Sequence, residues 1–372
     1  MGVQRLIIVR TVCTVRRQCK TERSVPRVGR EPPYDGPTVV VYGASGHTGS
    51  FVVDELWRRG IVPIASGRDA GKLEARGLAG RGIAVAEASI DDAGSMRRAF
   101  ARAAVVVNCA GPFLDTADAV IGAAIEVGAH YVDVTAEQAS VQATFNQYDD
   151  VARQAGLTVV PAMGFFGGLA DLLASAGSRD LDVIEQMDIA VFLDSWYPTA
   201  GTRRTGARNT APRMVVANGR LSPIADPPPK RKWSFPAPVG DVDVTGVPLS
   251  EVPVIARHLQ PVNMMTYLND DSLRDLADPN TPPPTAVDRL GRSAQSFVID
   301  LHITCGSLER RAVASGRDIY AITAPLVAEA TQQLLRGRSP AGVLAPGEHL
   351  SAVATLDALA HDYSGVQWTV TP

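Results

Sequence analysis

From residue 37 onwards, short apolar runs alternate with longer amphipathic stretches. Six runs rich in β-branched residues predict strands at 38–42, 62–65, 83–86, 104–108, 131–134 and 158–161. Between them, apolar residues recur at helical spacing over 51–59, 94–102, 117–127 and 141–155. Each connection has the length of one crossover helix, and the runs are apolar almost throughout, so the strands should be parallel and covered on both faces. The pattern predicts a doubly wound α/β domain.

The second half of the chain has a different pattern. After about residue 178 the alternation stops, and a longer strand is expected at 183–193. More than half of the chain's 26 prolines then lie between Pro198 and Pro284. Because proline removes a backbone donor and interrupts helices, we expect loops and edge strands there. Further on, 296–305 should pair with 311–315 as strands, and 320–335 should form an amphipathic helix.

The bulk composition limits the class of protein. A chain of 372 residues suits two domains, and 45% apolar with 20% charged residues is globular. A formal net charge of −3 gives no general attraction to nucleic acid or to anionic membranes, so neither is expected as a partner. The four cysteines show no paired spacing, which suits a reducing compartment, and we expect a cytoplasmic protein.

Residues 1–36 differ from the rest of the sequence. They are rich in arginine and poor in acids, and their one apolar run, at 6–9, is shorter than the core of a signal peptide. We therefore expect a disordered basic extension. A transit peptide and a start codon upstream of the natural one are the alternatives.

A glycine-rich turn follows the first predicted strand and reads Gly43-Ala44-Ser45-Gly46-His47-Thr48-Gly49. Glycines are needed where the backbone turns tightly and approaches a pyrophosphate, and the following helix offers free N–H groups and the positive end of its dipole. An ordinary strand-to-helix turn is the alternative. The position after the first strand of a βαβ series favours a Rossmann dinucleotide-binding domain at 37–178. No lysine follows the last glycine, which disfavours a nucleoside-triphosphate P-loop.

The end of the second predicted strand indicates which dinucleotide is bound. NAD-preferring domains place a carboxylate there for the ribose 2′-OH, whereas an arginine pairs with the 2′-phosphate of NADP. Here Arg68 comes first, followed by Asp69 and Lys72. We therefore expect NADP(H), with Arg68 and Lys72 as contacts. The alternative is that Arg68 is a solvated loop charge and Asp69 caps the next helix.

Two further strand ends should face the same ligand, because ligands bind outside the carboxyl ends of parallel strands. After the fourth strand, small residues and a proline-fixed turn would let the backbone lie along the nicotinamide ribose; this segment reads Asn108-Cys109-Ala110-Gly111-Pro112. Cys109, a small residue, is expected only to pack. Near the end of the fifth strand, Tyr131 and Glu137 are the candidates for acid–base catalysis. The alternative for Glu137 is a helix N-terminal acid favoured by the dipole.

Three segments together resemble the saccharopine-dehydrogenase-like family, which includes trans-acting enoyl reductases that serve polyketide synthases. They are Asn-Cys-Ala-Gly-Pro-Phe at 108–113, His-Tyr-Val-Asp-Val-Thr-Ala-Glu at 130–137 and Val-Pro-Ala-Met-Gly-Phe at 160–165. The resemblance is specific over 38–175 and looser at 320–324 and 342–347. It implies an NADP-binding Rossmann domain with Gly43, Gly46, Gly49 and Arg68 on dinucleotide positions and 108–112 on the nicotinamide side.

The sequence also departs from the family pattern at some positions. Asp171 stands where the family usually has an acid, but Ala136-Glu137 replaces the common Gly-Glu. Phe165-Phe166-Gly167-Gly168-Leu169 replaces a small-or-acidic residue and a proline. Both departures border the expected substrate side, so no relative's substrate is transferred to this chain.

Other catalytic chemistries find no support in the sequence. The six histidines show no metal-ligand spacing, so no metal is expected. No GxSxG elbow exists for a hydrolase. Tyr131 is not part of a YxxxK pair, because position 135 is a threonine. Arg203 and Arg204 could clamp an anionic substrate or lie in a solvated loop.

The favoured hypothesis is an NADP(H)-dependent oxidoreductase that transfers hydride to a C=C, C=N or C=O group of a small-molecule or carrier-bound substrate. A substrate or interface α+β domain at 179–315 is the candidate surface for a homodimer, and a C-terminal helical segment, 316–372, should pack back on the Rossmann domain. Two alternatives are a non-catalytic NADP(H) sensor and an enoyl reductase that docks on an acyl carrier protein. The latter would need a basic patch, for which Arg203, Arg204, Arg208 and 230–232 are candidates.

Overall fold

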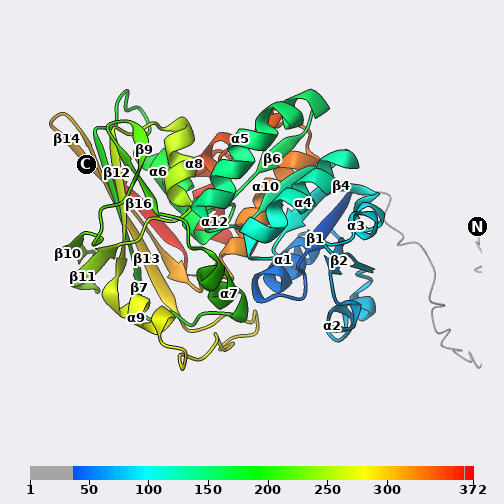
Figure 1. Ribbon diagram of the computed structural model, residues 1–372. Coiled ribbons are helices and arrows are strands. Elements are labelled where there is room, and N and C mark those ends of the chain that lie inside the picture. Colours follow the sequence, from blue (N-terminus) through cyan, green and yellow to red (C-terminus); the bar gives the residue numbers. More distant parts are fainter. Residues whose placement is uncertain (1–36, 364) are drawn as a thin grey trace, which may run out of the picture. The chain divides into compact units, whose positions relative to one another are not determined.

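Two β-sheets organise the chain (Figure 1). The computed structural model describes residues 37–363 and 365–372, so the extension expected at 1–36 lies outside the described residues. Within these ranges, no helix has both the length and the apolar character needed to cross a membrane. One apolar cluster contains Val41 of the first sheet and Ile299 of the second, so the two sheets share a core.

The first sheet has seven strands, and every pairing in it is parallel. Its order is β15 (Gly342–Val343), β6 (Thr158–Val160), β5 (His130–Asp133), β4 (Ala103–Asn108), β1 (Thr38–Tyr42), β2 (Pro63–Gly67) and β3 (Val85–Glu87). Six of these strands are those that the hydrophobic pattern predicts. The Rossmann-type doubly wound sheet is therefore confirmed, with one edge strand added from the C-terminal segment.

Strand β1 shows why the sheet is covered on both faces. Val39 and Val41 lie in one apolar cluster, and Val40 and Tyr42 lie in another on the opposite face. The helices packed around the sheet include α1 (His47–Arg58), α3 (Ala93–Phe100), α4 (Phe113–Glu126), α5 (Gln138–Ala155) and α10 (Thr323–Leu335). Residues of α1 and α10 belong to the first cluster, and residues of α3 and α4 belong to the second.

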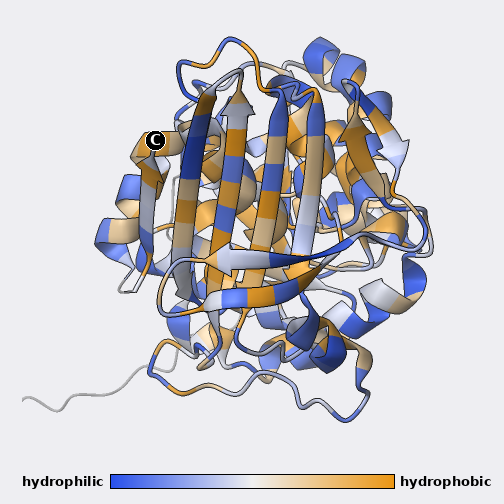
Figure 2. Ribbon diagram, turned by 90° about the vertical axis from the view of Figure 1, so that its left-hand side faces the viewer, coloured by the Kyte–Doolittle hydropathy of each residue, from blue (hydrophilic) through white to orange (hydrophobic). Residues whose placement is uncertain are grey.

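The second sheet is mixed. Its main path runs β10 (Lys230–Phe235), β11 (Gly240–Gly246), β12 (Asn263–Asn269), β7 (Gln186–Leu193), β13 (Ser296–Cys305), β14 (Leu308–Arg317) and β16 (Gln367–Thr371). A short hairpin, β8 (Met214–Ala217) and β9 (Arg220–Pro223), attaches to β12. In Figure 2, hydrophilic and hydrophobic residues alternate along the strands of this sheet. One face belongs to the shared core, and a smaller apolar cluster that includes Ala190, Trp233 and Tyr267 lies on the opposite face.

Three expectations for the second half need correction. Strand β12 is central although it lies in the proline-rich region; it forms because no proline occurs between Pro261 and Pro279. Strand β14 is longer than the predicted 311–315 and pairs with β13 along its full length. The C-terminal segment is not only helical. Helix α10 packs against α1, but β15 joins the first sheet and β16 joins the second.

Candidate functional site

The glycine turn lies at the carboxyl edge of the first sheet, between β1 and α1. Gly43 has a φ of +81°, in the left-handed region, and its N–H donates to the carbonyl of Ser66 at 2.8 Å. A Cβ atom on Gly43 would lie 2.8 Å from the nitrogen of Ala110, in the turn after β4. A Cβ atom on Gly49 would lie 2.3 Å from the carbonyl oxygen of Gly43. The turn therefore packs backbone against backbone and leaves no room for side chains at these two positions.

The N-terminus of α1 is open to a ligand. Gly46 occupies the N-cap position without a side-chain cap, and both Ser45 and Gly46 are exposed. The first N–H groups of a helix lack intrahelical partners, so this terminus can donate to an anion. The ring of His47 packs edge-on against Phe51 and Tyr320, with centroids 5.2 and 5.3 Å apart. Burial lowers the pKa of His47, so its side chain packs as a neutral ring.

Arg68 directly follows β2 and is exposed. It makes no hydrogen bond or ion pair with any described residue. Its neighbour Asp69 caps α2 (Ala70–Glu74) by accepting from the backbone N–H of Lys72 at 3.0 Å. Asp69 also forms an ion pair with the Lys72 ammonium at 3.4 Å. Arg68 is therefore available to an anion, whereas the charge of Lys72 is already shared with Asp69.

The ends of β4, β5 and β6 are joined by a buried polar network. The Asn108 amide donates to the Tyr131 hydroxyl at 3.1 Å, and this hydroxyl donates to Asp133 at 3.0 Å. Asp133 also accepts from the backbone N–H groups of Thr135 and Ala162, at 3.0 and 2.8 Å. Burial raises the pKa of Asp133 to about 6. The network fixes the relative positions of three strand ends.

The location of Tyr131 in this network bears on its expected role as an acid–base catalyst. The side chain is fully buried, burial raises its pKa well above the ordinary value, and the residue does not line the cavity described below. A proton donor must come within hydrogen-bonding distance of the reacting atom. Tyr131 is therefore a positioning residue within the network, and a catalytic role does not fit its location.

Glu137 holds the turn that follows β4. Its two carboxylate oxygens accept from the backbone N–H groups of Phe113 at 2.7 Å and Leu114 at 3.1 Å, at the start of α4. Glu137 is thus a helix N-terminal acid, but for α4 and not for α5, the helix that follows it in the sequence. Burial raises its pKa, although the N–H donors oppose this. Each oxygen is occupied, so the geometry favours a structural role.

The turn after β4 is fixed from within as well. Asn108 accepts from the N–H of Ala110 at 3.0 Å, and the Thr116 hydroxyl donates to the Ala110 carbonyl at 2.6 Å. Pro112 occupies the N-cap of α4. The adjacent Cys109 is partly buried, and this burial raises the pKa of its thiol, so the thiol stays protonated. This turn, Gly43 and the start of α1 form one rigid edge that faces the ligand position expected in an open α/β sheet.

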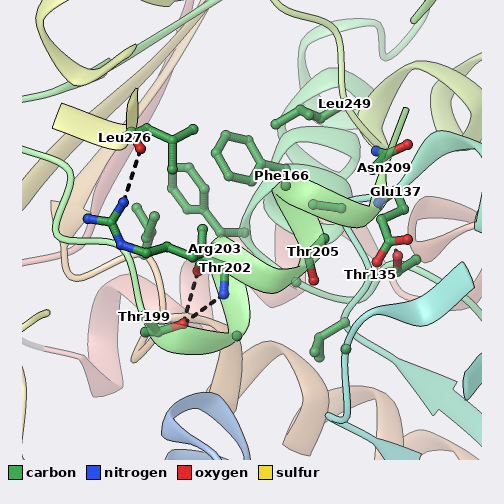
Figure 3. A pocket seen from close by; sticks show the side chains of 18 of the residues that line it. Thr135, Glu137, Phe166, Thr199, Thr202, Arg203, Thr205, Asn209, Leu249 and Leu276 are labelled. Atoms are coloured by element: carbon green, nitrogen blue, oxygen red, sulfur yellow. Dashed lines mark hydrogen bonds between the residues drawn. The ribbon is translucent and has the colours of Figure 1, made fainter. Parts of the chain in front are cut away.

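A cavity of about 600 Å³ opens at this edge (Figure 3). The carboxyl edge of the first sheet contributes Thr48 from α1, Cys109 and Gly111 from the turn after β4, and Glu137 from the loop after β5. The remaining walls come from later parts of the chain, chiefly the π-helical turn Phe165–Leu169 and helices α7 (Ala200–Arg208) and α9 (Asp270–Ala277). The expected dinucleotide edge and the second sheet's helices therefore share a single cavity.

Tyr320 connects the cavity wall to α7. Its hydroxyl oxygen accepts from the Trp196 indole N–H at 3.2 Å and lies 2.9 Å from the hydroxyl oxygen of Thr202. It also accepts from the backbone N–H of Thr199, at 3.4 Å. The predictions from sequence missed both α7 and the role of Tyr320. The segment 198–209 carries no motif, and long-range contacts, including those of Tyr320, hold it over the cavity.

The basic residues proposed for carrier docking are mostly engaged with the protein. Arg203 donates to backbone carbonyl oxygens, and Arg208 pairs with Asp115 at 2.8 Å. Each residue of 230–232 pairs with an aspartate, at distances from 3.1 to 3.6 Å. Surface pairs of this kind neutralise much of the local field. Their arrangement gives little support to a docking patch.

Asp171 lies outside the cavity. Its carboxylate oxygens contact the His258 ring nitrogen and the N–H of Gly347, both at 2.7 Å, and it is fully buried. It joins α6 (Ala170–Gly177) to α8 (Glu251–His258) and α11 (Pro346–His349). Within the described ranges, no group of three or more histidine, cysteine or acidic side chains is placed to hold a metal ion.

Comparisons with known proteins agree with the resemblance inferred from the sequence. Residues 39–160 match the saccharopine dehydrogenase NADP binding domain. A lipid droplet localized protein of Caenorhabditis elegans is 35% identical over 146 residues, which cover 36% of this chain and 34% of that protein. The human saccharopine dehydrogenase-like oxidoreductase is 30% identical over 152 residues, which cover 36% of this chain and 35% of the human protein. The resemblance is confirmed over these residues and supports a nicotinamide cofactor.

A solved structure extends the likeness to the fold of nearly the whole chain. Apo saccharopine dehydrogenase (L-Glu forming) from Saccharomyces cerevisiae superposes with a TM-score of 0.64 at 14% identity, covering 91% of this chain and all of that one. At this identity the match shows the fold alone. The curated relatives, in turn, are matched over only about a third of their length.

Proposed function

We propose that this chain is an NADP(H)-dependent oxidoreductase of the saccharopine-dehydrogenase-like type. It would transfer hydride between the nicotinamide and a C=C, C=N or C=O group of a substrate held in the cavity. The observation that carries this proposal is that Thr48 of α1 and Gly111 of the turn after β4 line the same cavity as the walls from the second half of the chain. A dinucleotide on the glycine turn would therefore end beside the space for a substrate.

Each part of the edge would have a separate task. The open N-terminus of α1 would donate to the pyrophosphate, and Arg68 would pair with the 2′-phosphate. The turn fixed by Asn108 and Glu137 would orient the nicotinamide ribose. The bound cofactor supplies the hydride chemistry. The chain itself would position the reacting carbon and exclude water with the apolar walls of the cavity.

The test is a fluorescence titration with NADPH on wild type and on Gly46→Leu. Gly46 is exposed at the α1 N-terminus, so leucine there should block the approach of the pyrophosphate while the protein stays folded. Gly80→Leu is the matched control, because a Cβ at Gly80 meets nothing within 4 Å. Loss of binding in Gly46→Leu alone supports the proposal. Absence of NADPH binding by wild type would refute it, and NADPH binding without reduction of any enoyl, imine or carbonyl compound would favour a sensor.

A further inference from the structure

The three charged side chains that line the cavity are all used by the protein itself. Both carboxylate oxygens of Glu137 accept from backbone N–H groups. The Arg203 guanidinium donates to the carbonyl oxygens of Leu276, Asp278 and Thr281, at 3.4, 3.0 and 2.9 Å. Arg213 donates to the carbonyl oxygen of Pro248 at 3.0 Å. A charged ligand group would have to compete for these donors and acceptors.

Much of the cavity lining is apolar and aromatic. Phe165 and Phe166 pack edge-to-face with centroids 5.0 Å apart, and Phe166 lies 5.8 Å from Trp196. Leu249, Leu273 and Leu276 also belong to the lining. Figure 3 shows Phe166 between the labelled side chains of Leu276 and Leu249. Such a surface gains free energy by covering apolar ligand area.

Thr205 and Asn209, two polar side chains of the lining, remain available to a ligand. Neither side chain makes a hydrogen bond with any described residue. Thr205 lies against the turn after β4, since a Cβ atom built on Gly111 would be 2.9 Å from its hydroxyl oxygen. Both groups are uncharged, and together they offer hydroxyl and amide donors and acceptors. They can bind a carbonyl or hydroxyl group of a neutral ligand.

We infer that the substrate is an uncharged, largely apolar molecule whose polar end lies at Thr205 and Asn209 and whose apolar body lies against Phe165, Phe166 and Trp196. The reaction of this substrate rests on the proposed function, whereas its chemical class is argued from the cavity lining alone. An ionised group loses its hydration when it enters an apolar site, and the guanidinium groups of Arg203 and Arg213 already donate to backbone carbonyl oxygens. The cavity should therefore favour neutral molecules over amino acids and carboxylates, whether or not the nucleotide is bound.

The test compares three probes of similar size by isothermal titration calorimetry on the full chain. They are trans-cinnamamide, which is neutral, trans-cinnamate, which is anionic, and L-phenylalanine, which is zwitterionic. Cinnamamide should bind about tenfold or more tightly than either of the others. Equal or tighter binding of cinnamate or phenylalanine would overturn the inference and would assign Arg203 or Arg213 to the substrate. Failure of cinnamamide to bind up to its solubility would overturn it as well.

Two variants locate the binding site. Leu276→Ala removes part of the apolar wall and should weaken cinnamamide binding roughly three- to tenfold. Leu308→Ala, at the exposed first position of β14, is the matched control and should leave the affinity unchanged. Equal effects of the two variants would refute binding in this cavity. The titrations are run with and without NADP⁺. A protein that binds cinnamamide selectively but does not bind NADPH would refute the proposed function without contradicting the inferred ligand class.

Discussion

Replacing Arg68 with alanine tests whether the end of β2 selects NADP(H) over NAD(H). The side chain is exposed and makes no hydrogen bond or ion pair with any described residue. Its removal therefore breaks no contact that the fold depends on. An effect on nucleotide affinity would come from the lost interaction with the ligand and not from a change in stability. Asp69, the only acid in this turn, is occupied as the cap of α2 and in the ion pair with Lys72.

The expected magnitude follows from the exposure of the site. A hydrogen bond to a charged group contributes about 1.5–3 kcal/mol, and solvent screening places an exposed pair near the lower limit. Since about 1.4 kcal/mol corresponds to a tenfold change in affinity, Arg68→Ala should weaken NADPH binding roughly tenfold. NADH has no 2′-phosphate, so its affinity should stay nearly constant. Lys72 can compensate in part, and the Arg68→Ala, Lys72→Ala double variant should show the larger loss.

The assay is a fluorescence titration of each variant with NADPH and with NADH. Arg338→Ala is the matched control, because Arg338 is also exposed and without an ion pair among the described residues. It precedes β15, whose first residue pairs with the first residue of β6, so it lies near the amino-terminal edge of the sheet. The salt dependence adds a second criterion: the advantage of NADPH over NADH should shrink as ionic strength rises.

Two results would refute the reasoning. Equal losses of NADPH and NADH affinity in Arg68→Ala would mean that the side chain supports the local fold. A wild-type protein that prefers NADH would contradict the assignment of the strand end, whatever the variant does.

Three further predictions concern the framework of the site. Gly49→Ala places a Cβ 2.3 Å from the carbonyl oxygen of Gly43, so overpacking should cost about 1–3 kcal/mol and abolish NADPH binding; an unchanged thermal midpoint and titration would contradict this. Asp133 has its pKa raised to about 6, so the folded state binds its proton more tightly than the unfolded state, and stability falls as pH rises from about 4 to 6. Asp133→Asn should remove this pH dependence of the free energy of unfolding, which amounts to about 3 kcal/mol at most. Urea unfolding at several pH values measures it. Tyr320→Phe removes the contact between the Tyr320 hydroxyl and Thr202. Hydrogen exchange of the α7 amides should become faster, while NADPH affinity stays within about twofold. Unchanged exchange in α7 would show that Tyr320 does not hold this helix in place.

Local features of this sequence determined the first sheet and the dinucleotide edge. Strands with β-branched runs and crossover helices are short-range patterns, and they predict a parallel sheet whose carboxyl ends converge. The glycines at 43 and 49 are needed because of backbone approaches within that same edge, so a local motif was sufficient to identify them. The sequence also placed Arg68 directly after β2, while its contact with a 2′-phosphate stays a prediction.

Only the tertiary structure decided the roles of the other site residues. Glu137 caps α4, a helix that begins 24 residues before it, and no pattern near Glu137 names that partner. Tyr131 lies in a network that joins three strands, which a single strand's sequence does not reveal. Helix α7 forms part of the cavity wall, and its Thr202 hydroxyl contacts the hydroxyl of Tyr320, 118 residues further along the chain. Hydrophobic periodicity specifies which face of an element is buried, but the partner on that face depends on packing between segments far apart in the chain.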